Sequence, residues 1–248
     1  MPIRVSVNEL SALLKRCFEG LGYRSGDYAD AATACIWMET HALNGLALLM
    51  DSWQSLVDGA ALSPTIRTTT GANIAVDANR VSLLVCGQSL AELAISKLQD
   101  DGLNRIDVYA CRNRIAIVPG VAAIAQRGYS ALAHWRCKNF QYYAVASAGN
   151  AMPRIAKFTL TEPKQRAAET LHLICSRAAA EIESALRSLN DMERRVTPIV
   201  EPVSMLESFN NSIEHGLQVD NDIWMRLNSA ADAVLVKATE QSRRGAGA

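Results

Sequence analysis

Two short stretches of this 248-residue chain hold side chains that could do chemistry on a small molecule. In the first, Arg112 and Arg114 flank Asn113, directly after an alternating apolar and polar segment that predicts a strand. Guanidinium groups at the end of a strand can hold a carboxylate or phosphate through paired hydrogen bonds. These three residues are therefore candidate substrate-binding residues. The alternative is that the two arginines are simply solvated.

The second stretch is Leu171 to Cys175, an apolar segment in which His172 is the one strongly polar residue. Such a run predicts a strand in the interior of a sheet. An imidazole there can exchange protons with a ligand if it faces a cleft, or it can be a core histidine bonded to a backbone carbonyl. Under the functional interpretation, His172 lies at the floor of a cleft with its ring reaching solvent. Both interpretations stay open.

The other histidines are weaker candidates. His41 lies at the predicted end of a helix, where the helix dipole favours an imidazolium, so it could serve as a cap or as a catalytic group. His134 lies late in a predicted strand, and His215 precedes a glycine and is expected to be exposed. No dinucleotide, phosphate-loop, nucleophile-elbow or zinc-protease motif occurs. The six cysteines stand singly without ligand spacing, which predicts buried free thiols and no metal site.

The elements around the arginine loop form a recognisable order. Arg105 to Ala110 predicts a strand, Cys111 to Val118 a loop, Val121 to Gln126 a helix and Tyr129 to Trp135 a second strand. Two strands joined through a helix are the unit of a parallel sheet. Open α/β sheets usually bind ligands beyond the carboxyl ends of their strands, which is where this loop stands.

The first sixty residues predict three helices. Ser6 and Glu9 have the spacing of a capping box, and the second helix runs from about Ser25 to Thr40. A turn follows, and Leu46 to Val57 forms the third helix. Further along, strands are expected at 66–70, 74–76, 80–86, 140–146 and 155–160, helices from Ser89, after Ser176, before Gly216 and after Asp220 or Asp222, and a loop at 192–202. The predicted parts are a helical region 1–60, a sheet domain 61–238 closed by C-terminal helices, and a mobile tail 239–248.

Composition narrows the function classes. Hydrophobic residues make up 49% of the chain, and 25 basic side chains balance 25 acidic ones. A chain of zero net charge lacks the basic excess that nucleic acid or an acidic membrane requires, so neither is expected as a partner. The neutral charge leaves self-association unopposed. The start of the chain has no apolar signal region, and no apolar run approaches the ~18 residues of a membrane span, which predicts a cytoplasmic protein.

The order of these pieces resembles the type-2 malate/L-lactate dehydrogenase family, which includes reductases of small 2-oxo and cyclic imino acids. The resemblance runs through Val5 to Leu10, Asn44-Gly45 into Leu46 to Gly59, Gln88 to Lys97, Val121 to Gly128, and Gly216 to Trp224. A closer likeness is to an uncharacterised bacterial family related to these enzymes, whose tail is similar to Thr239 to Arg243. The resemblance implies an α/β fold with a three-helix N-terminal part packed on a mixed sheet, distinct from the Rossmann fold, and a homodimer with a cleft between subunits.

This sequence departs from the family's pattern at the positions that carry the family's catalytic residues. The proton-donating histidine of the enzymes falls at Asn44, and the arginine that pairs with the substrate carboxylate falls at Leu48. An amide cannot replace imidazole as a proton donor at neutral pH. An aspartate on the family's interior strand falls at about His172. The glycine-rich segments that line the nicotinamide have no counterpart, so NAD or NADP is implied by the resemblance alone.

Two hypotheses follow. The first is an oxidoreductase-like enzyme that acts on, or binds, a small carboxylated metabolite, a 2-oxo, 2-hydroxy or imino acid. His172 or His41 would then transfer the proton, Asn44 would bind a substrate oxygen, and Arg112 or Arg114 would hold the carboxylate. The second is a catalytically degenerate relative that binds a metabolite or serves as the partner subunit of another protein, without dehydrogenase activity. The two replaced catalytic positions favour the second hypothesis.

Overall fold

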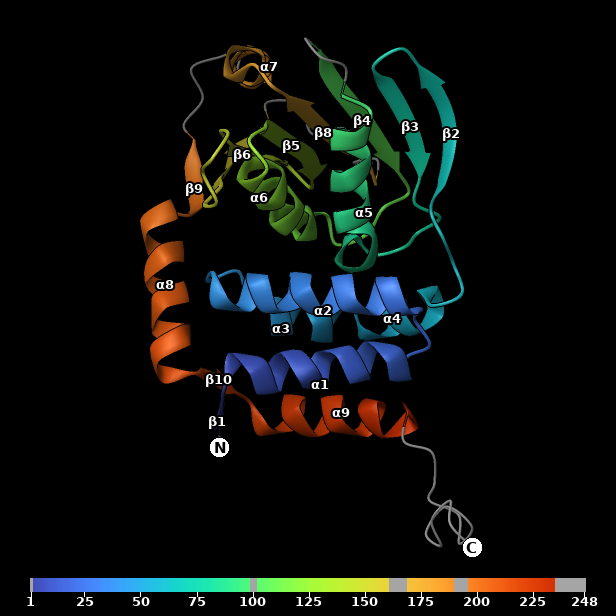
Figure 1. Cartoon of the computed structure of the whole chain (residues 1–248), viewed down its shortest axis with the longest axis vertical. Helices are drawn as coiled ribbons and strands as arrows, with labels where there is room; N and C mark the ends of the chain where they lie inside the picture. Colours follow the sequence, from blue (N-terminus) through green and yellow to red (C-terminus); the bar gives the residue numbers. More distant parts are fainter. Residues whose placement is uncertain (1, 99–101, 161–168, 190–195, 235–248) are drawn as a thin grey trace, which may run out of the picture.

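The computed structural model describes residues 2–98, 102–160, 169–189 and 196–234. A mixed sheet and a stack of helices form the two regions of the molecule (Figure 1). The predicted fold class, α/β with a helical N-terminal part packed on a mixed sheet, is confirmed. The helical part reaches the sheet through α5 (Leu83–Ser96) and α6 (Val118–Gln126), which lie between α2 (Ser25–Thr40) and the strands.

Within the described residues, the main sheet has eight strands in the order β2-β3-β4-β8-β5-β6-β7-β9. The parallel pair in this part of the chain is β3 with β4, and the other neighbours are antiparallel. The strands are β2 (Thr65–Thr70), β3 (Asn73–Asp77), β4 (Leu103–Tyr109), β5 (Ser130–Cys137), β6 (Phe140–Ala146), β7 (Arg154–Thr159), β8 (Leu171–Ser176) and β9 (Thr197–Val200).

The expected parallel pair around the arginine loop is corrected by this order. β4 and β5 run in the same direction, but β8 lies between them and is antiparallel to both. The helix that links two hydrogen-bonded parallel strands is instead α5, between β3 and β4. The prediction went wrong because the chain inserts β8, which follows β4 by more than sixty residues, into the centre of the sheet. No local pattern could indicate that insertion.

The strand expected at 80–86 is also wrong, because α5 begins within this segment, six residues before the expected helix start at Ser89. Ser82 is the N-cap, and its hydroxyl accepts a hydrogen bond from the Leu84 N–H at 3.2 Å. The apolar run after Ser82 fits a buried helix as well as a buried strand, and the cap decides between them. The expected loop at 192–202 contains β9, which pairs with β7, in its described part.

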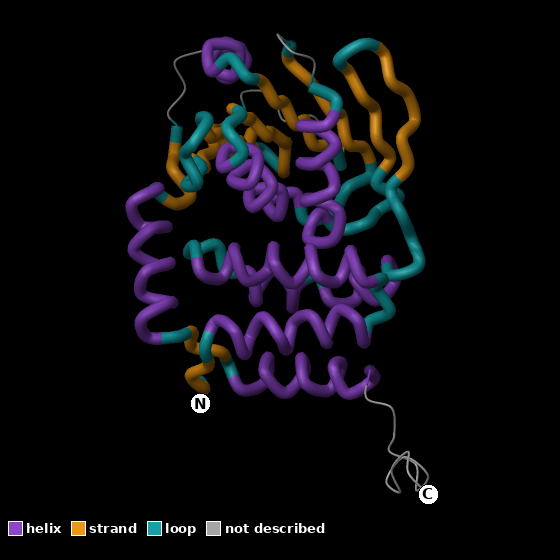
Figure 2. Tube along the Cα trace, viewed as in Figure 1, coloured by secondary structure: helices purple, strands orange, loops and turns teal. Residues whose placement is uncertain are grey.

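The helical region is built from both ends of the chain. α1 (Val7–Gly20) begins with the predicted capping box of Ser6 and Glu9. The third predicted helix is two helices, α3 (Gly45–Asp51) and α4 (Trp53–Gly59), because the helix is interrupted at Ser52. α9 (Asn221–Ala231) packs beside α1, and β1 (Ile3–Val5) pairs with β10 (Leu217–Val219), as Figure 2 shows. The division into parts at residues 60 and 238 stays a prediction, and the tail 239–248 lies outside the described residues.

Two apolar clusters form the core. The larger one fills the space between α5, α6, the inner face of the sheet and the N-terminal helices. The smaller one lies on the outer face of the sheet, where Leu132, Phe158 and Ile174 pack under Ile182 of α7 (Ala179–Leu189). α8 (Pro202–His215) stands at the side of the molecule, against one end of α2. The outer face of the sheet is therefore apolar where α7 covers it.

Candidate functional site

A row of polar side chains crosses the outer face of the sheet beside this apolar cluster. Asp107 on β4, His172 on β8 and His134 on β5 are direct cross-strand partners. Because side chains alternate along a strand, all three project from the same face. Their neighbours on the strands, such as Ile106 and Leu173, are fully buried toward α5 and α6. The polar row therefore faces away from α5 and α6.

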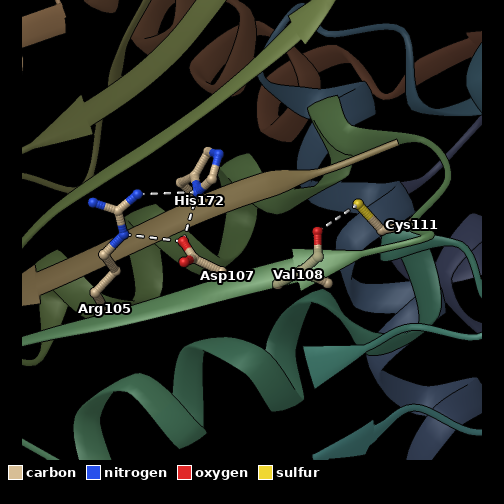
Figure 3. A network of polar contacts seen from close by, with 5 residues as sticks. All are labelled: Arg105, Asp107, Val108, Cys111 and His172. Carbon is tan, nitrogen blue, oxygen red and sulfur yellow. Dashed lines mark hydrogen bonds and ion pairs between the residues drawn. The ribbon is translucent and has the colours of Figure 1, made fainter. Parts of the chain in front are cut away.

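The centre of the site is a contact between an imidazole and a carboxylate. His172 Nδ1 lies 2.6 Å from Asp107 Oδ1, and Arg105 Nε donates to the same oxygen at 3.0 Å (Figure 3). Arg105 Nη2 lies 3.3 Å from His172 Nδ1. Nδ1 can either donate to the carboxylate or accept from the guanidinium. The shorter, charge-assisted contact decides for donation to Asp107, which leaves Nε2 of the ring for another partner.

The electrostatics of Asp107 agree with this assignment. Burial alone would raise the pKa of its carboxyl, but the hydrogen bonds from His172 and Arg105 outweigh burial, and the pKa lies below its ordinary value. Asp107 is therefore an anion at neutral pH and accepts the hydrogen bond from His172. The His172 side chain is 28% exposed, and its partner is a carboxylate rather than a backbone carbonyl. The cleft expected above it stays a prediction.

His134 completes the row. Its ring stacks on the His172 ring with centroids 4.6 Å apart and planes at 25°. Burial, followed by the neighbouring cationic groups His172 and Arg105, lowers the pKa of His134 to about 3, so the ring is neutral. In the part of the chain that the structure describes, no group of His, Cys, Asp or Glu side chains has the arrangement of a metal site. The stacked rings present faces to each other, whereas a metal needs their nitrogen lone pairs to converge.

The predicted loop site is placed elsewhere and is tied into the fold. Asn113 adopts a left-handed conformation with φ +55°. Its Oδ1 accepts from Ser82 Oγ at 2.8 Å, and its Nδ2 donates to Ser52 Oγ at 2.5 Å. Ser82 is the cap of α5, and Ser52 is the break between α3 and α4. The Asn113 amide therefore links Ser52 of the helical region to Ser82 at the start of α5.

The two arginines of the loop differ from each other. Arg114 donates through Nη1 to the Cys111 carbonyl at 3.4 Å and through Nη2 to the Arg136 carbonyl at 3.3 Å, while its buried Nε has no partner. Arg112 is half-buried, and within the described residues its guanidinium makes no hydrogen bond or ion pair. The role of either arginine in carboxylate binding stays a prediction, with Arg112 the freer of the two.

The two predicted residues of the N-terminal turn also lie apart from His172. His41 is buried, stacks on Trp37 with centroids 4.0 Å apart, and donates through Nδ1 to the Trp37 carbonyl at 2.7 Å. Burial lowers the pKa of His41, opposite to the shift expected from the helix dipole. Asn44 is exposed at the N-cap of α3, where the Leu46 N–H binds the Glu39 carboxylate instead. Nothing in the described contacts joins either residue to His172.

Sequence reasoning missed the partners of His172. Arg105 and Asp107 alternate with apolar residues on β4, which indicates a polar outer face. That alternation could have suggested them as candidates. Their meeting with His172, and the stacking of His134, depend on the position of β8 between β4 and β5.

Comparisons with known proteins agree with this architecture. Malate dehydrogenase from Pyrococcus horikoshii OT3 superposes with a TM-score of 0.70 at 12% identity, covering 95% of this chain and 97% of that chain. The fold is malate/lactate dehydrogenase-like. Malate dehydrogenase from Entamoeba histolytica gives a TM-score of 0.69 at 8% identity, covering 96% of this chain and 100% of that chain. Delta1-piperideine-2-carboxylate reductase from Pseudomonas syringae pvar. tomato gives 0.63 at 14% identity, covering 92% and 99%.

Sequence comparison is less specific. A family model described as a protein of unknown function, DUF3726, matches residues 5–104. No curated protein matches the chain. The low identities of the structural neighbours show a shared fold and leave activity and substrate to be argued from the site itself. No helix in the described ranges is both long and apolar enough to cross a bilayer.

NAD or NADP, which the type-2 dehydrogenase resemblance implies, is usually approached closely by glycine backbone. A Cβ on Gly216 would lie 2.6 Å from the Val5 carbonyl oxygen, and one on Gly87 would lie 3.1 Å from that of Ala116. At these two glycines, the space that a Cβ would take is occupied by the chain's own backbone. Gly128 and Gly149 have nothing within 4 Å and stand at turns. These four glycines therefore give no sign of a dinucleotide cradle.

Proposed function

We propose that the outer-face site binds a small carboxylated metabolite, a 2-oxo, 2-hydroxy or imino acid, and that His172 exchanges a proton with it. The observation that carries the proposal is the 2.6 Å contact between His172 and Asp107 beneath a partly exposed ring. A carboxylate that fixes one ring nitrogen makes the other nitrogen a proton donor or acceptor. Asp107 would thus act through His172.

Arg105 supplies the second element of the site. Its side chain is 40% exposed, and its Nη1 has no hydrogen-bond partner in the described part of the chain, while Nε holds Asp107. A guanidinium edge that remains open can bind the carboxylate of a ligand whose C2 oxygen or nitrogen reaches His172 Nε2. The proposal covers binding and proton transfer. No hydride step is proposed.

A second candidate role, that of a partner subunit, draws support from α8. Val203, Leu206 and Ile213 are large apolar side chains that are exposed on this helix. Exposed apolar side chains that gather on one element favour a protein partner, and the zero net charge of the chain does not oppose a homodimer. Light scattering at several protein concentrations tests this role. A strict monomer at every concentration would contradict the homodimer.

Binding is tested by thermal shift and calorimetry with pyruvate, oxaloacetate, L-lactate and L-malate, and separately with NADH and NADPH. A specific ligand at 100 times its dissociation constant should stabilise the fold by roughly 2.7 kcal/mol. We expect at least one of the acids to bind without a nicotinamide. If none of these acids binds, the proposal fails.

His172→Gln locates the binding. Loss of a charge-assisted hydrogen bond of about 1.5–3 kcal/mol should weaken binding roughly 10- to 100-fold, while the melting temperature changes little because the ring is not in the core. His215→Gln, on the exposed end of α8, is the matched control and should bind as the unsubstituted protein does. Unchanged affinity in His172→Gln, or a large loss of stability with affinity preserved, would show that His172 has only a structural role.

A further inference from the structure

His134 is a polar side chain whose position the fold does not explain. It is 9% exposed, yet neither ring nitrogen has a hydrogen-bond partner within the described residues. Neither nitrogen is among the fully buried polar atoms that lack a partner, so in the described part of the chain both are left to water or to a ligand. The apolar residues beside it on the same face, such as Leu132, show that β5 could carry a hydrophobic side chain here.

The position of His134 indicates what its missing partner is. Its ring lies against the His172 ring with centroids 4.6 Å apart, and the two residues are directly opposite each other on β5 and β8. Both rings project from the outer face, so a ligand atom over His172 Nε2 also lies beside the edge of His134. Figure 3 shows the His172 ring standing above Asp107 on this face.

We propose that His134 is a second ligand-binding group of the outer-face site, a neutral imidazole that hydrogen-bonds the same C2 oxygen or nitrogen that exchanges a proton with His172. This inference rests on the proposed function and assigns the residue that would select for a polar atom at C2. The ligand needs a polar atom on the carbon next to the carboxylate, because an acid without one leaves the His134 nitrogen unpaired. Rejection on this ground is stronger than rejection by shape alone.

The charges around the pair make their roles unequal. Two stacked imidazolium rings would repel each other, so a positive charge on both rings at once is unfavourable. His172 Nδ1 contacts Asp107 directly, whereas His134 has no such carboxylate contact in the described residues. His134 faces His172, Arg105 and Arg136, which oppose its protonation, and the more distant Asp107, which favours it. A neutral ring can donate or accept through either nitrogen, so His134 can pair with a hydroxyl or a carbonyl oxygen.

The charge state is tested without any ligand. Long-range ¹H–¹⁵N spectra of the imidazole nitrogens report the protonation and tautomer of each histidine as pH is varied. We expect His134 to stay neutral from pH 8 to 5, and the His172 signals to shift in Asp107→Asn. A His134 ring that becomes charged at or above pH 6 would overturn the proposal, whatever the ligand experiments show.

The binding role is tested with oxamate, a stable analogue of a 2-oxo acid, and with propionate, which lacks a polar atom at C2. His134→Phe keeps a stacked ring without nitrogens and should weaken oxamate binding about tenfold, the loss of one hydrogen bond of about 1.4 kcal/mol. His134→Gln should recover part of that loss. Propionate should bind more weakly than oxamate to the unsubstituted protein and should be affected less by His134→Phe. His215→Phe is the control.

The outcomes separate the two proposals. If His134→Phe binds oxamate as tightly as the unsubstituted protein, His134 is not a ligand-binding group, and the proposed function stands without it. If propionate and oxamate bind equally, the requirement for a C2 polar atom is wrong. If the unsubstituted protein binds neither oxamate nor any of the four acids, the proposed function fails and takes the binding role of His134 with it.

Discussion

The arginine loop and the outer-face site hold similar side chains and use them differently. In the loop, both ends of the Asn113 amide are hydrogen-bonded, to Ser82 and to Ser52, and Arg114 donates to two backbone carbonyls. On the outer face, His172 Nε2 and Arg105 Nη1 have no hydrogen-bond partner among the described residues. Polar residues at the end of a strand therefore do not by themselves indicate a ligand-binding site. A ligand can bind only those polar atoms that are not already hydrogen-bonded within the protein.

The cause of the difference lies in what covers each region. The loop lies between the start of α5 and Ser52, which separates α3 from α4, so both ends of the Asn113 amide find partners within the protein. On the outer face, α7 packs over the apolar cluster around Ile182. Two residues along β8 from Ile174 of this cluster, the same face carries His172, and two residues along β5 from Leu132 it carries His134. The side chains of this face therefore change from apolar to polar beside the cluster that α7 covers.

The strongest test of the comparison is Asn113→Ala. It removes two hydrogen bonds, one with Ser82 at the start of α5 and one with Ser52 in the helical region, and it leaves an alanine at φ +55°. We expect a loss of about 2–4 kcal/mol in the free energy of unfolding, or roughly 5–15 °C in melting temperature, from urea and thermal denaturation. Oxamate affinity per folded molecule should not change.

Asn113→Gly is the matched control for the loop. Glycine adopts the same φ without strain, so Asn113→Gly should cost about 1 kcal/mol less than Asn113→Ala while losing the same hydrogen bonds. If Asn113→Ala instead left stability unchanged and abolished binding, the loop would be the ligand site, and the comparison would be reversed.

Acid sensitivity distinguishes the imidazoles. Burial sets the pKa of His41 and His134 below the ordinary value of 6.5 in the folded chain, so the unfolded chain binds more protons below that pH. The stability that these neutral rings contribute is present above pH 6.5 and is lost as pH falls below it. For His134 the loss continues toward pH 3, with a slope of up to about 1.4 kcal/mol per pH unit.

Urea denaturation between pH 7 and 5 measures that slope. His134→Phe should flatten it, and His41→Phe, which keeps the ring stack on Trp37, should flatten it as well. Asp107 does not interfere, because its lowered pKa places its titration below this range. A slope that is the same in His134→Phe and the unsubstituted protein would contradict a neutral, buried His134.

The smallest effect is expected for Arg112→Gln. Its guanidinium has no partner in the described part of the chain, so stability should change by less than about 0.5 kcal/mol. Oxamate affinity should change less than about twofold, whereas Arg105→Gln should weaken it roughly tenfold because a charged contact to the carboxylate is lost. Calorimetry on both variants decides. A tenfold loss in Arg112→Gln with none in Arg105→Gln would assign the carboxylate to the loop, as the sequence suggested.

Local signals in the sequence predicted much of the fold. The capping box at Ser6, the helix from Ser25 to Thr40 and the alternating strands β4 and β6 were all indicated, because helix caps and side-chain periodicity act over a few residues. After Ser82 the apolar pattern was ambiguous and the prediction failed, because a buried strand and a buried helix can have the same continuous run of apolar residues.

For the site, the sequence determined one residue and the tertiary structure decided the rest. His172 stands out as the single strongly polar residue in an apolar strand, and that is visible without coordinates. Its carboxylate partner lies 65 residues earlier in the chain, and its stacking partner lies on a different strand. Strand order is chosen by burial over the whole sheet, which no local pattern records. Placing β8 between β4 and β5 turned a lone histidine into a site.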